Sequence, residues 1–419
     1  MNRDNSGVNL PALRSHNAAL VLDLLRMAAE DGISRLELAE RTGLTPQAVS
    51  KITARLRGEG LAEEAGRRAS TGGKPRTVLR LVPGAGHAVG LHLDRDEVTA
   101  VLVDLAGVVV AERCGALDFG EGVEAVVDAA VRVVAAVVGD SPIPPLPAVA
   151  SAAPPRGVAV PRAPVGDLRP PVLNRRTGLI CPSGLVIGVG VAAPGPLDHG
   201  AGVLHRVTGF PQWNGVPLRE VLARRLGSDV VLDKDTNAAA LGLALRGPGA
   251  SDSFAYLHLG SGLGAGLVLD GALYRGARTG AGEFGHQTIL LGGPPCGCGG
   301  RGCIEALCLG AVERGDPAAA ARFLGAGAAN LVGLLDIDRV LLGGRTVDAH
   351  RDLFVRGVGA VLEERARRQG GAPAVPVVAA DGGRGAVAEG AAQLVLAPVF
   401  GRGTAPARGG PNHNGPKMA

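Results

Sequence analysis

Four soft metal ligands lie within eighteen residues of this chain, and they constrain its fold more than any other feature. One histidine precedes three cysteines by ten, twelve and seventeen positions: His286, Cys296, Cys298 and Cys303. Three thiolates and one imidazole complete the tetrahedral shell of a structural Zn²⁺ and leave no open position for an activated water. The sequence therefore predicts a structural zinc site, with three buried free cysteines beside a chance histidine as the alternative.

Length and composition favour a protein of two or three domains that works inside the cell. The 419 residues are 46% hydrophobic, which is enough for large cores, although only 2% are aromatic. No stretch reaches the eighteen or so uninterrupted apolar residues of a membrane span, and the first residues lack the apolar core of a signal peptide. Clustered cysteines fit a reducing compartment better than a disulfide framework. We therefore expect a soluble, cytoplasmic protein with no membrane contact.

The first eighty residues predict three short helices followed by a hairpin. Apolar residues recur at helical spacing over 17–30, and Ser34 with Glu37 forms a capping box that starts a second helix ending near Arg41. Thr45 and Pro46 are typical of the start of a third helix, which runs to about Leu56. Strands are expected over 61–64 and 77–81. A helix, a tight turn, a capped helix and a hairpin are typical of a winged helix-turn-helix.

The third helix has the composition of a helix that reads DNA. With its apolar residues facing the core, polar and cationic side chains remain exposed: Gln47, Ser50, Lys51 and Arg55. Lys74 and Arg76 belong to a basic hairpin loop suited to phosphates. Residues 45–80 carry eight cations and three carboxylates, a larger surplus than the +4 of the whole chain. A small helical domain used for protein contacts is the alternative.

Motifs downstream resemble those of one known family. GEFGH (282–286), followed after nine residues by CxCGxxGCxE (296–305), resembles the signature of the ROK family, which contains repressors and sugar kinases. Further segments resemble that family at 188–198 (GVGVAAPGPLD), 233–242 (DKDTNAAALG), 259–286 and 340–344 (VLLGG). The resemblance implies an α/β fold class: a winged helix-turn-helix over residues 1–82, then a two-lobed, actin-like, sugar-kinase-like domain over 83–400.

The same resemblance assigns a sugar pocket. Asp235 matches the catalytic base of the kinases, and Glu283, His286 and Glu305 match residues that bind other sugar hydroxyls. Carboxylates and imidazole suit polyols because each accepts charge-assisted hydrogen bonds. His286 would then serve both metal and sugar. Lys234 stands where the kinases carry Asn, and Asp235 as a helix N-cap and Glu305 as a partner of Arg301 are the structural alternatives.

One departure from the family argues against a working kinase. Where the kinases place an Asp-x-Gly-Gly-Thr turn against ATP phosphates, this chain has residues 92–96, His-Leu-Asp-Arg-Asp. Both glycines are replaced, and the carboxylates of Asp94 and Asp96 would face a polyphosphate, at a cost of roughly 1–4 kcal/mol for a like-charge pair at about 4 Å.

Three segments depart from the family in length or composition. Residues 139–184 are rich in Pro, Ala and Arg and are expected to be a disordered insertion, and residues 401–419 a disordered tail. The segment after Glu305 is shorter than in the family, which would open part of the sugar pocket or alter a dimer surface.

Together these features favour a sugar-responsive transcriptional repressor of carbohydrate metabolism genes. It would bind operator DNA as a homodimer or homotetramer and take a sugar or amino sugar as effector. An ATP-dependent hexose kinase that carries a DNA-binding head is the runner-up. A regulator that binds DNA without responding to sugar is the third interpretation.

Overall fold

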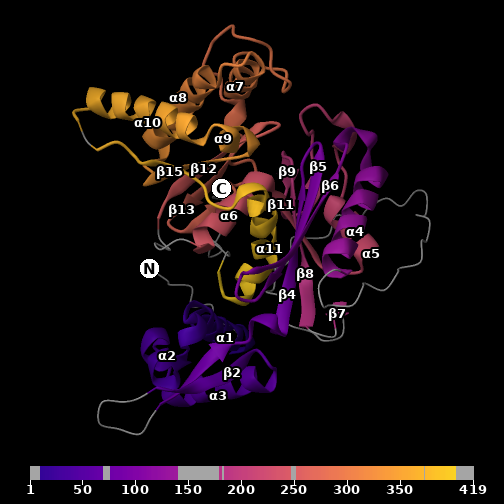
Figure 1. The fold of residues 1–419 in the computed structure, drawn as a ribbon, viewed down its shortest axis with the longest axis vertical. Coiled ribbons are helices and arrows are strands. Elements are labelled where there is room, and N and C mark those ends of the chain that lie inside the picture. Colours follow the sequence, from indigo (N-terminus) through magenta and orange to yellow (C-terminus); the bar gives the residue numbers. More distant parts are fainter. Residues whose placement is uncertain are drawn as a thin grey trace, which may run out of the picture.

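The protein consists of a small N-terminal head below two α/β lobes (Figure 1). The computed structural model describes residues 10–68, 76–139, 179–181, 184–246, 252–371 and 373–402. The head has a three-stranded sheet, the first lobe a six-stranded sheet and the second lobe a five-stranded sheet. This is the arrangement that the sequence predicts.

Helices α1, α2 and α3 of the head pack on a sheet of strand order β1-β3-β2. The elements are α1 (Leu10–Met27), β1 (Ile33–Ser34), α2 (Arg35–Thr42), α3 (Pro46–Gly58), β2 (Ala62–Arg68) and β3 (Arg76–Leu81). The first helix begins earlier than predicted and ends at Met27, because a separate 3-10 turn covers 29–31. The hairpin tip at 69–75, with Lys74, lies outside the described residues.

Both predicted helix caps of the head are present. The Ser34 hydroxyl accepts from the Glu37 N–H at 3.3 Å, and the Glu37 carboxylate accepts from the Ser34 N–H at 2.8 Å. At the start of α3 the Thr45 hydroxyl accepts from the Ala48 N–H at 3.2 Å. These bonds satisfy amides that a helix start leaves free, so the two helices begin where the sequence places them.

The first lobe is a mixed sheet of order β11-β8-β4-β5-β6, with β7 paired to β8 and with α4 and α5 on one face. Its strands and helices are β4 (Gly86–Leu93), β5 (Glu97–Asp104), β6 (Val109–Ala116), α4 (Val123–Gly139), β7 (Leu179–Cys181), β8 (Gly184–Ala193), α5 (Leu218–Leu226) and β11 (Val230–Lys234). A two-stranded ribbon, β9 (Leu197–Asp198) with β10 (Val203–Leu204), lies between β8 and α5 in sequence.

The boundaries predicted for the insertion at 139–184 are wrong at both ends. Helix α4 continues through Gly139, strand β7 occupies Leu179–Cys181, and β8 begins at Gly184. β7 pairs antiparallel with β8, so these residues gain ladder hydrogen bonds that composition alone does not reveal. Residues 140–178 and 182–183 lie outside the described residues.

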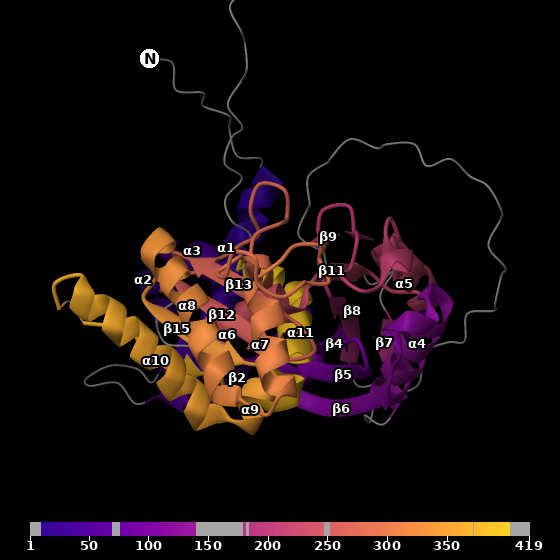
Figure 2. The same cartoon turned by 90° about the horizontal axis from the view of Figure 1, so that it is seen from above.

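The second lobe is a sheet of order β14-β13-β12-β15-β16. Helices α7 to α10 cover one face, above the strands in Figure 1 and opposite α6, and Figure 2 shows α10 farthest from the first lobe. The elements are β12 (Phe254–Leu259), β13 (Leu263–Leu269), β14 (Ala272–Tyr274), α7 (Ile304–Glu313), α8 (Pro317–Leu335), β15 (Arg339–Gly343), α9 (Arg345–Ala349), α10 (Arg351–Arg368) and β16 (Val377–Ala379). Strand side chains alternate between the two faces of a sheet, so the other face of β12 packs toward the centre of the molecule.

Two helices, α6 (Asp235–Arg246) and α11 (Ala386–Val399), form a layer between the two sheets (Figure 1). They share one core with Phe254 and Tyr256 of β12. α11 approaches the first-lobe sheet at backbone distance, since a Cβ added at Gly90 or Gly190 would lie 1.8 Å from a carbonyl oxygen of α11. Gly390 of α11 approaches α6 equally closely, because a Cβ there would lie 2.0 Å from the Ala238 carbonyl oxygen.

The end of α11 joins the head to the lobes. Phe400, which is 2% exposed, belongs to one apolar cluster with Leu22 and Leu25 of α1. The Arg26 guanidinium lies 4.8 Å from the Phe400 ring centroid. Arg402 donates to the Asp23 carboxylate at 2.7 and 3.0 Å. The expectation that disorder begins at residue 401 is therefore wrong for residues 401 and 402, and 403–419 lie outside the described residues.

Helix α8 is long and apolar enough to cross a membrane by length and composition alone. Half of its apolar window is buried, and it packs against α7 and α10. Such burial is what a core helix of a globular lobe shows.

From this packing we predict that Phe400→Ala destabilises the head more than the two lobes. Truncating a fully buried phenylalanine removes about 3–5 kcal/mol of packing free energy. Amide hydrogen exchange measured by mass spectrometry should therefore be faster in α1 than in the wild type. Leu291→Ala is the control, because Leu291 is 91% exposed in the second lobe. Unchanged exchange in α1 would contradict a structural role for this junction.

Candidate functional site

Helix α3 presents a polar, cationic face to solvent. Val49 and Leu56 are buried beneath it, and the Thr53 hydroxyl donates to the Val49 carbonyl at 2.9 Å. The four predicted contact residues of this helix are all exposed: Gln47, Ser50, Lys51 and Arg55. Arg76 is also exposed at the start of β3. The structure thus places these residues where a ligand could reach them.

Part of the basic surplus of the head is neutralised within the head. Arg57 pairs with Glu64 at 3.0 Å and Arg80 with Glu63 at 2.6 Å. Arg55 lies 3.9 Å from Glu59, a loose contact between half-exposed side chains. Lys51 has no ion pair in the described part of the chain. Charge counting could not identify the pairs of Arg57 and Arg80, because they join β2 to α3 and β2 to β3.

The four predicted metal ligands come together in the loop before α7. Their ligand atoms all lie within 4.8 Å of one another. The Cys298 and Cys303 sulfurs are 3.8 Å apart, and the Cys296 sulfur is 3.7 Å from His286 Nδ1. Tetrahedral metal–sulfur bonds of about 2.3 Å separate two sulfurs by about 3.8 Å. The geometry therefore fits a metal ion held by one imidazole and three thiolates.

Without a metal, Cys303 favours its protonated form. Burial raises the pKa of Cys303 to about 12, so the free thiol resists ionisation. A cation bonded to the sulfur stabilises the thiolate, and binding then releases a proton. The Nδ1 atom of His286 faces the sulfurs, which leaves Nε2 available to another partner.

The predicted sugar-binding residues lie where the lobes meet. Asp235 is the first residue of α6, directly after β11. Glu283 precedes a 3-10 turn, η5 (Phe284–His286), in the second lobe. Glu305 is 8% exposed in the first turn of α7, and its carboxylate accepts from the Leu263 N–H at 2.9 Å. Glu305 therefore bonds backbone rather than Arg301, the alternative partner.

Asp235 also makes the local bond of a helix start. Its Oδ1 atom accepts from the Thr236 N–H at 2.6 Å. Burial is the main cause that raises the pKa of Tyr256, and the Asp235 charge adds to it. Asp235 is therefore a half-buried carboxylate whose charge acts on Tyr256 of β12.

Lys234 is buried and pairs with a predicted sugar ligand. Its ammonium donates to Glu283 Oε1 at 3.1 Å and to the Ala281 carbonyl. Only 4% of the lysine side chain is exposed, against 37% of the Glu283 side chain. Since Lys234 ends β11 and Glu283 lies in the second lobe, this pair bridges the lobes.

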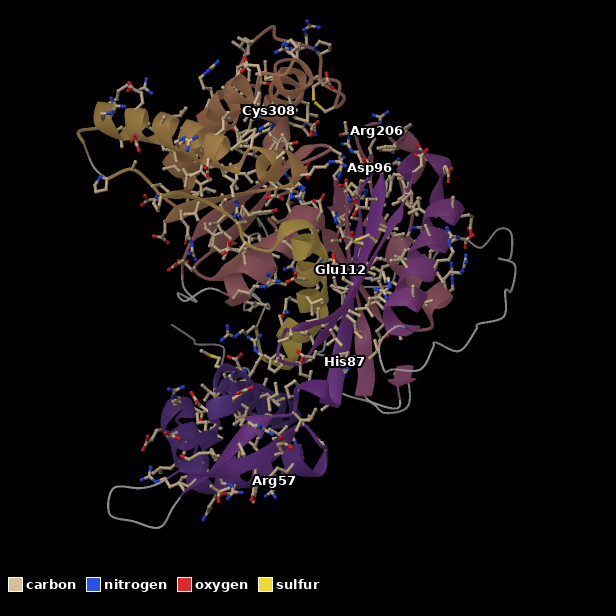
Figure 3. All side chains as sticks on the ribbon, viewed as in Figure 1. Arg57, His87, Asp96, Glu112, Arg206 and Cys308 are labelled. Carbon is tan, nitrogen blue, oxygen red and sulfur yellow. The ribbon has the colours of Figure 1, made fainter. Side chains whose placement is uncertain are left out.

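The carboxylates of Asp94 and Asp96, which the sequence places opposite a polyphosphate, both bond to groups of the second lobe. Asp94 accepts from the Ser261 hydroxyl at 2.8 Å, and Asp96 accepts from Arg345 at 2.7 and 3.0 Å. Figure 3 shows Asp96 at the end of the first-lobe sheet that faces the second lobe. The positions of the kinase phosphate loop are thus occupied by hydrogen bonds between the lobes.

Burial and hydrogen bonding shift the pKa values of three groups at this contact. Burial lowers the pKa of His92, so the imidazole favours its neutral form. Burial alone would raise the pKa of Asp94, but the hydrogen bonds from the Arg95 N–H and the Ser261 hydroxyl, with the charge of Arg345, lower it. The bond to Asp96 raises the pKa of Arg345. Asp94 and Arg345 are therefore both charged at neutral pH.

Further bonds between the lobes were not predicted. Arg275 donates to buried Asp233 at 2.7 Å, and the Thr279 hydroxyl donates to the Leu197 carbonyl at 2.8 Å. The partners are 42 and 82 positions apart. No local sequence pattern marks such distant pairs, so the sequence could not identify them.

Comparison with known proteins identifies two family segments. A ROK family profile matches residues 182–314, and a winged helix-turn-helix DNA-binding profile matches residues 24–63. The chain is 28% identical over 274 residues to the xylose repressor of Caldicellulosiruptor bescii, and 27% identical to that of Bacillus subtilis. Each match covers 65% of this chain and 59% or 61% of the relative, so the chain spans less than two thirds of these repressors.

A shorter segment matches a kinase at higher sequence identity. Over 121 residues, 28% of this chain and 38% of the relative, it is 43% identical to the glucokinase of Thermotoga maritima.

Solved structures show the same fold. A ROK family transcriptional regulator, a homologue of the E. coli MLC protein, superposes with a TM-score of 0.66 at 20% identity, over 93% of this chain and 97% of that one. A ROK glucokinase from Streptomyces griseus, solved with glucose and AMPPNP, superposes at 0.54 with 25% identity, over 74% and 99%. The glucokinase structure corresponds to the two lobes, and the transcriptional regulator corresponds to the lobes together with the head.

Proposed function

Because this chain joins a winged helix-turn-helix to a ROK-family domain, we propose that it is a sugar-responsive, DNA-binding transcriptional repressor. The observation that carries the proposal is the single apolar cluster joining the head to α11, which also packs on both lobes. A head fused in this way to a sugar-kinase-like domain can respond to a ligand between the lobes. The xylose repressors similar to this chain support a role in carbohydrate metabolism.

The head would bind double-stranded operator DNA through α3. Its exposed face offers Gln47 and Ser50 to base edges and Lys51 and Arg55 to phosphates, while the hairpin with Lys74 and Arg76 would reach the adjacent backbone. A homodimer or homotetramer would read a palindrome whose half-sites are about one DNA turn apart. Such a protein works in the cytoplasm.

Lys51→Gln should weaken DNA binding at every sequence and lower the salt slope by about one, because one phosphate contact is lost. Fluorescence anisotropy across a salt series measures both quantities. Arg57→Gln is the matched control, since Glu64 already pairs with Arg57. Equal slopes for the wild type and Lys51→Gln would remove α3 as the DNA-contacting helix.

The effector would be a sugar bound between the lobes by Asp235, Glu283, His286 and Glu305. Its binding affects DNA affinity only if the two lobe arrangements bind it with different affinity. Asp235 begins α6, which packs on α11, so a displacement at the pocket has a short path to the head.

Asp235→Ala should leave operator affinity intact and abolish the response to sugar, because a charge-assisted bond to a hydroxyl worth about 1.5–3 kcal/mol is lost. Anisotropy with increasing sugar measures the response. Asp352→Ala, at an exposed position of α10, serves as the control. Sugar-induced release equal to that of the wild type would exclude Asp235 from the pocket.

The metal is proposed to be Zn²⁺ held by His286, Cys296, Cys298 and Cys303. Four soft ligands match its tetrahedral preference, and the ion would fix the loop that carries Glu305 at its end.

Cys298→Ser should lose the metal and the sugar response together, as measured by elemental analysis and by sugar titration. Cys114→Ser is the control, since Cys114 is an exposed cysteine of β6 outside the cluster. A Cys298→Ser protein that retains a full equivalent of zinc and responds to sugar would contradict this assignment.

An ATP-dependent hexose kinase is the second candidate. Asp235 and the glucokinase match favour it, whereas the bonds of Asp94 and Asp96 across the phosphate loop oppose it. A coupled phosphorylation assay with common hexoses should show no turnover above a no-enzyme control. Saturable, ATP-dependent turnover would establish the kinase.

A further inference from the structure

Lys234 is held rigidly beside the proposed sugar pocket. It is 3% exposed, and its side-chain stem lies under Gly195 of the first lobe, where an added Cβ would be 2.8 Å from Lys234 Cδ. Its ammonium reaches the second lobe and donates to Glu283 and to the Ala281 carbonyl. A buried ammonium of this kind requires a counter-ion, because an unpaired one is costly.

The neighbouring carboxylate of Asp233 is already committed elsewhere. It accepts from Arg275 Nε at 2.7 Å, from Asn237 Nδ2 at 2.8 Å and from the Lys234 backbone N–H at 2.8 Å. Its side chain is 1% exposed. Glu283 is therefore the counter-ion of the Lys234 ammonium.

A sugar hydroxyl that binds Glu283 would make the same kind of bond as Lys234. Both are donors to a carboxylate, and such charge-assisted bonds are strong because the acceptor carries a full charge. One oxygen of Glu283 is occupied by the ammonium, which also neutralises the carboxylate. A hydroxyl therefore meets a weaker acceptor than an unpaired glutamate would offer.

We propose that Lys234 is a tethered competitor for Glu283 that sets the affinity of the pocket for neutral sugars. This inference rests on the proposed sugar-binding function and names Lys234 as the residue that tunes the affinity for sugar. Lys234 ends a first-lobe strand and Glu283 belongs to the second lobe, so a sugar that takes over Glu283 breaks one bond between the lobes. Ligand binding and lobe separation are thereby linked through one ion pair.

The test is calorimetric titration of the full chain with D-xylose and D-glucose. Lys234→Asn and Lys234→Gln, which replace the ammonium with a neutral amide, should bind one of these sugars about tenfold more tightly, as expected when one charge-assisted bond no longer competes. Glu283→Gln should cancel that gain in the double variant. Arg356→Gln, which removes an exposed cation of α10, should bind as the wild type does. Thermal melts identify any variant that fails to fold.

Each outcome separates this inference from the proposed function. Wild-type binding that is unchanged or weakened in both folded Lys234 variants overturns the competitor and leaves the sugar pocket standing. Tighter binding that survives Glu283→Gln also overturns it, because the competition is then not for Glu283. If neither sugar binds the wild type or the variants, the competitor and its neutral-sugar pocket both fail, while the DNA titrations still decide the regulator.

Discussion

Close backbone packing of α11 between the two lobes is the constraint on which the rest of the structure depends. Gly90 and Gly190 let this helix lie directly on the first-lobe sheet, and Gly390 brings it against α6. Any side chain at these positions would meet a carbonyl oxygen at about 2 Å or less. Because a packed contact of this kind deforms little, the proposed function needs α6 and α11 to move together. Phe400, directly after the end of the same helix, packs in the apolar core of the head.

Polar groups of the two lobes bond one another beside this layer. Asp94 and Asp96 bond the turn and helix of the second lobe that lie opposite them, and Lys234 bonds Glu283 on the sugar side. The first contact lies at the positions that match the phosphate loop of the family's kinases, and the second lies at the proposed sugar pocket. These bonds argue against the kinase alternative, whereas Asp235, His286 and Glu305 remain the proposed partners of a sugar. The bonds between the lobes therefore support the proposed regulatory function over the proposed kinase.

Features encoded over short distances could be predicted from the sequence, and long-range pairs could not. The capping box of Ser34 and the metal ligands from His286 to Cys303 depend on spacing, and the structure has both. The short strand β7 was missed because its three residues gain stability only from pairing with β8. The partner of Asp96 lies 249 positions away, and neither residue carries a local signal for the other. Such tertiary pairs decided how Asp94, Asp96 and Lys234 should be interpreted.

The most direct test of the account is fluorescence anisotropy of the full chain on DNA from upstream of its own gene. A scrambled duplex at the same stated salt is the control, and a panel of sugars and amino sugars is added in turn. The account predicts binding that prefers the upstream DNA by at least about a thousandfold and that one sugar shifts. Equal affinity for both duplexes at every salt concentration would contradict it.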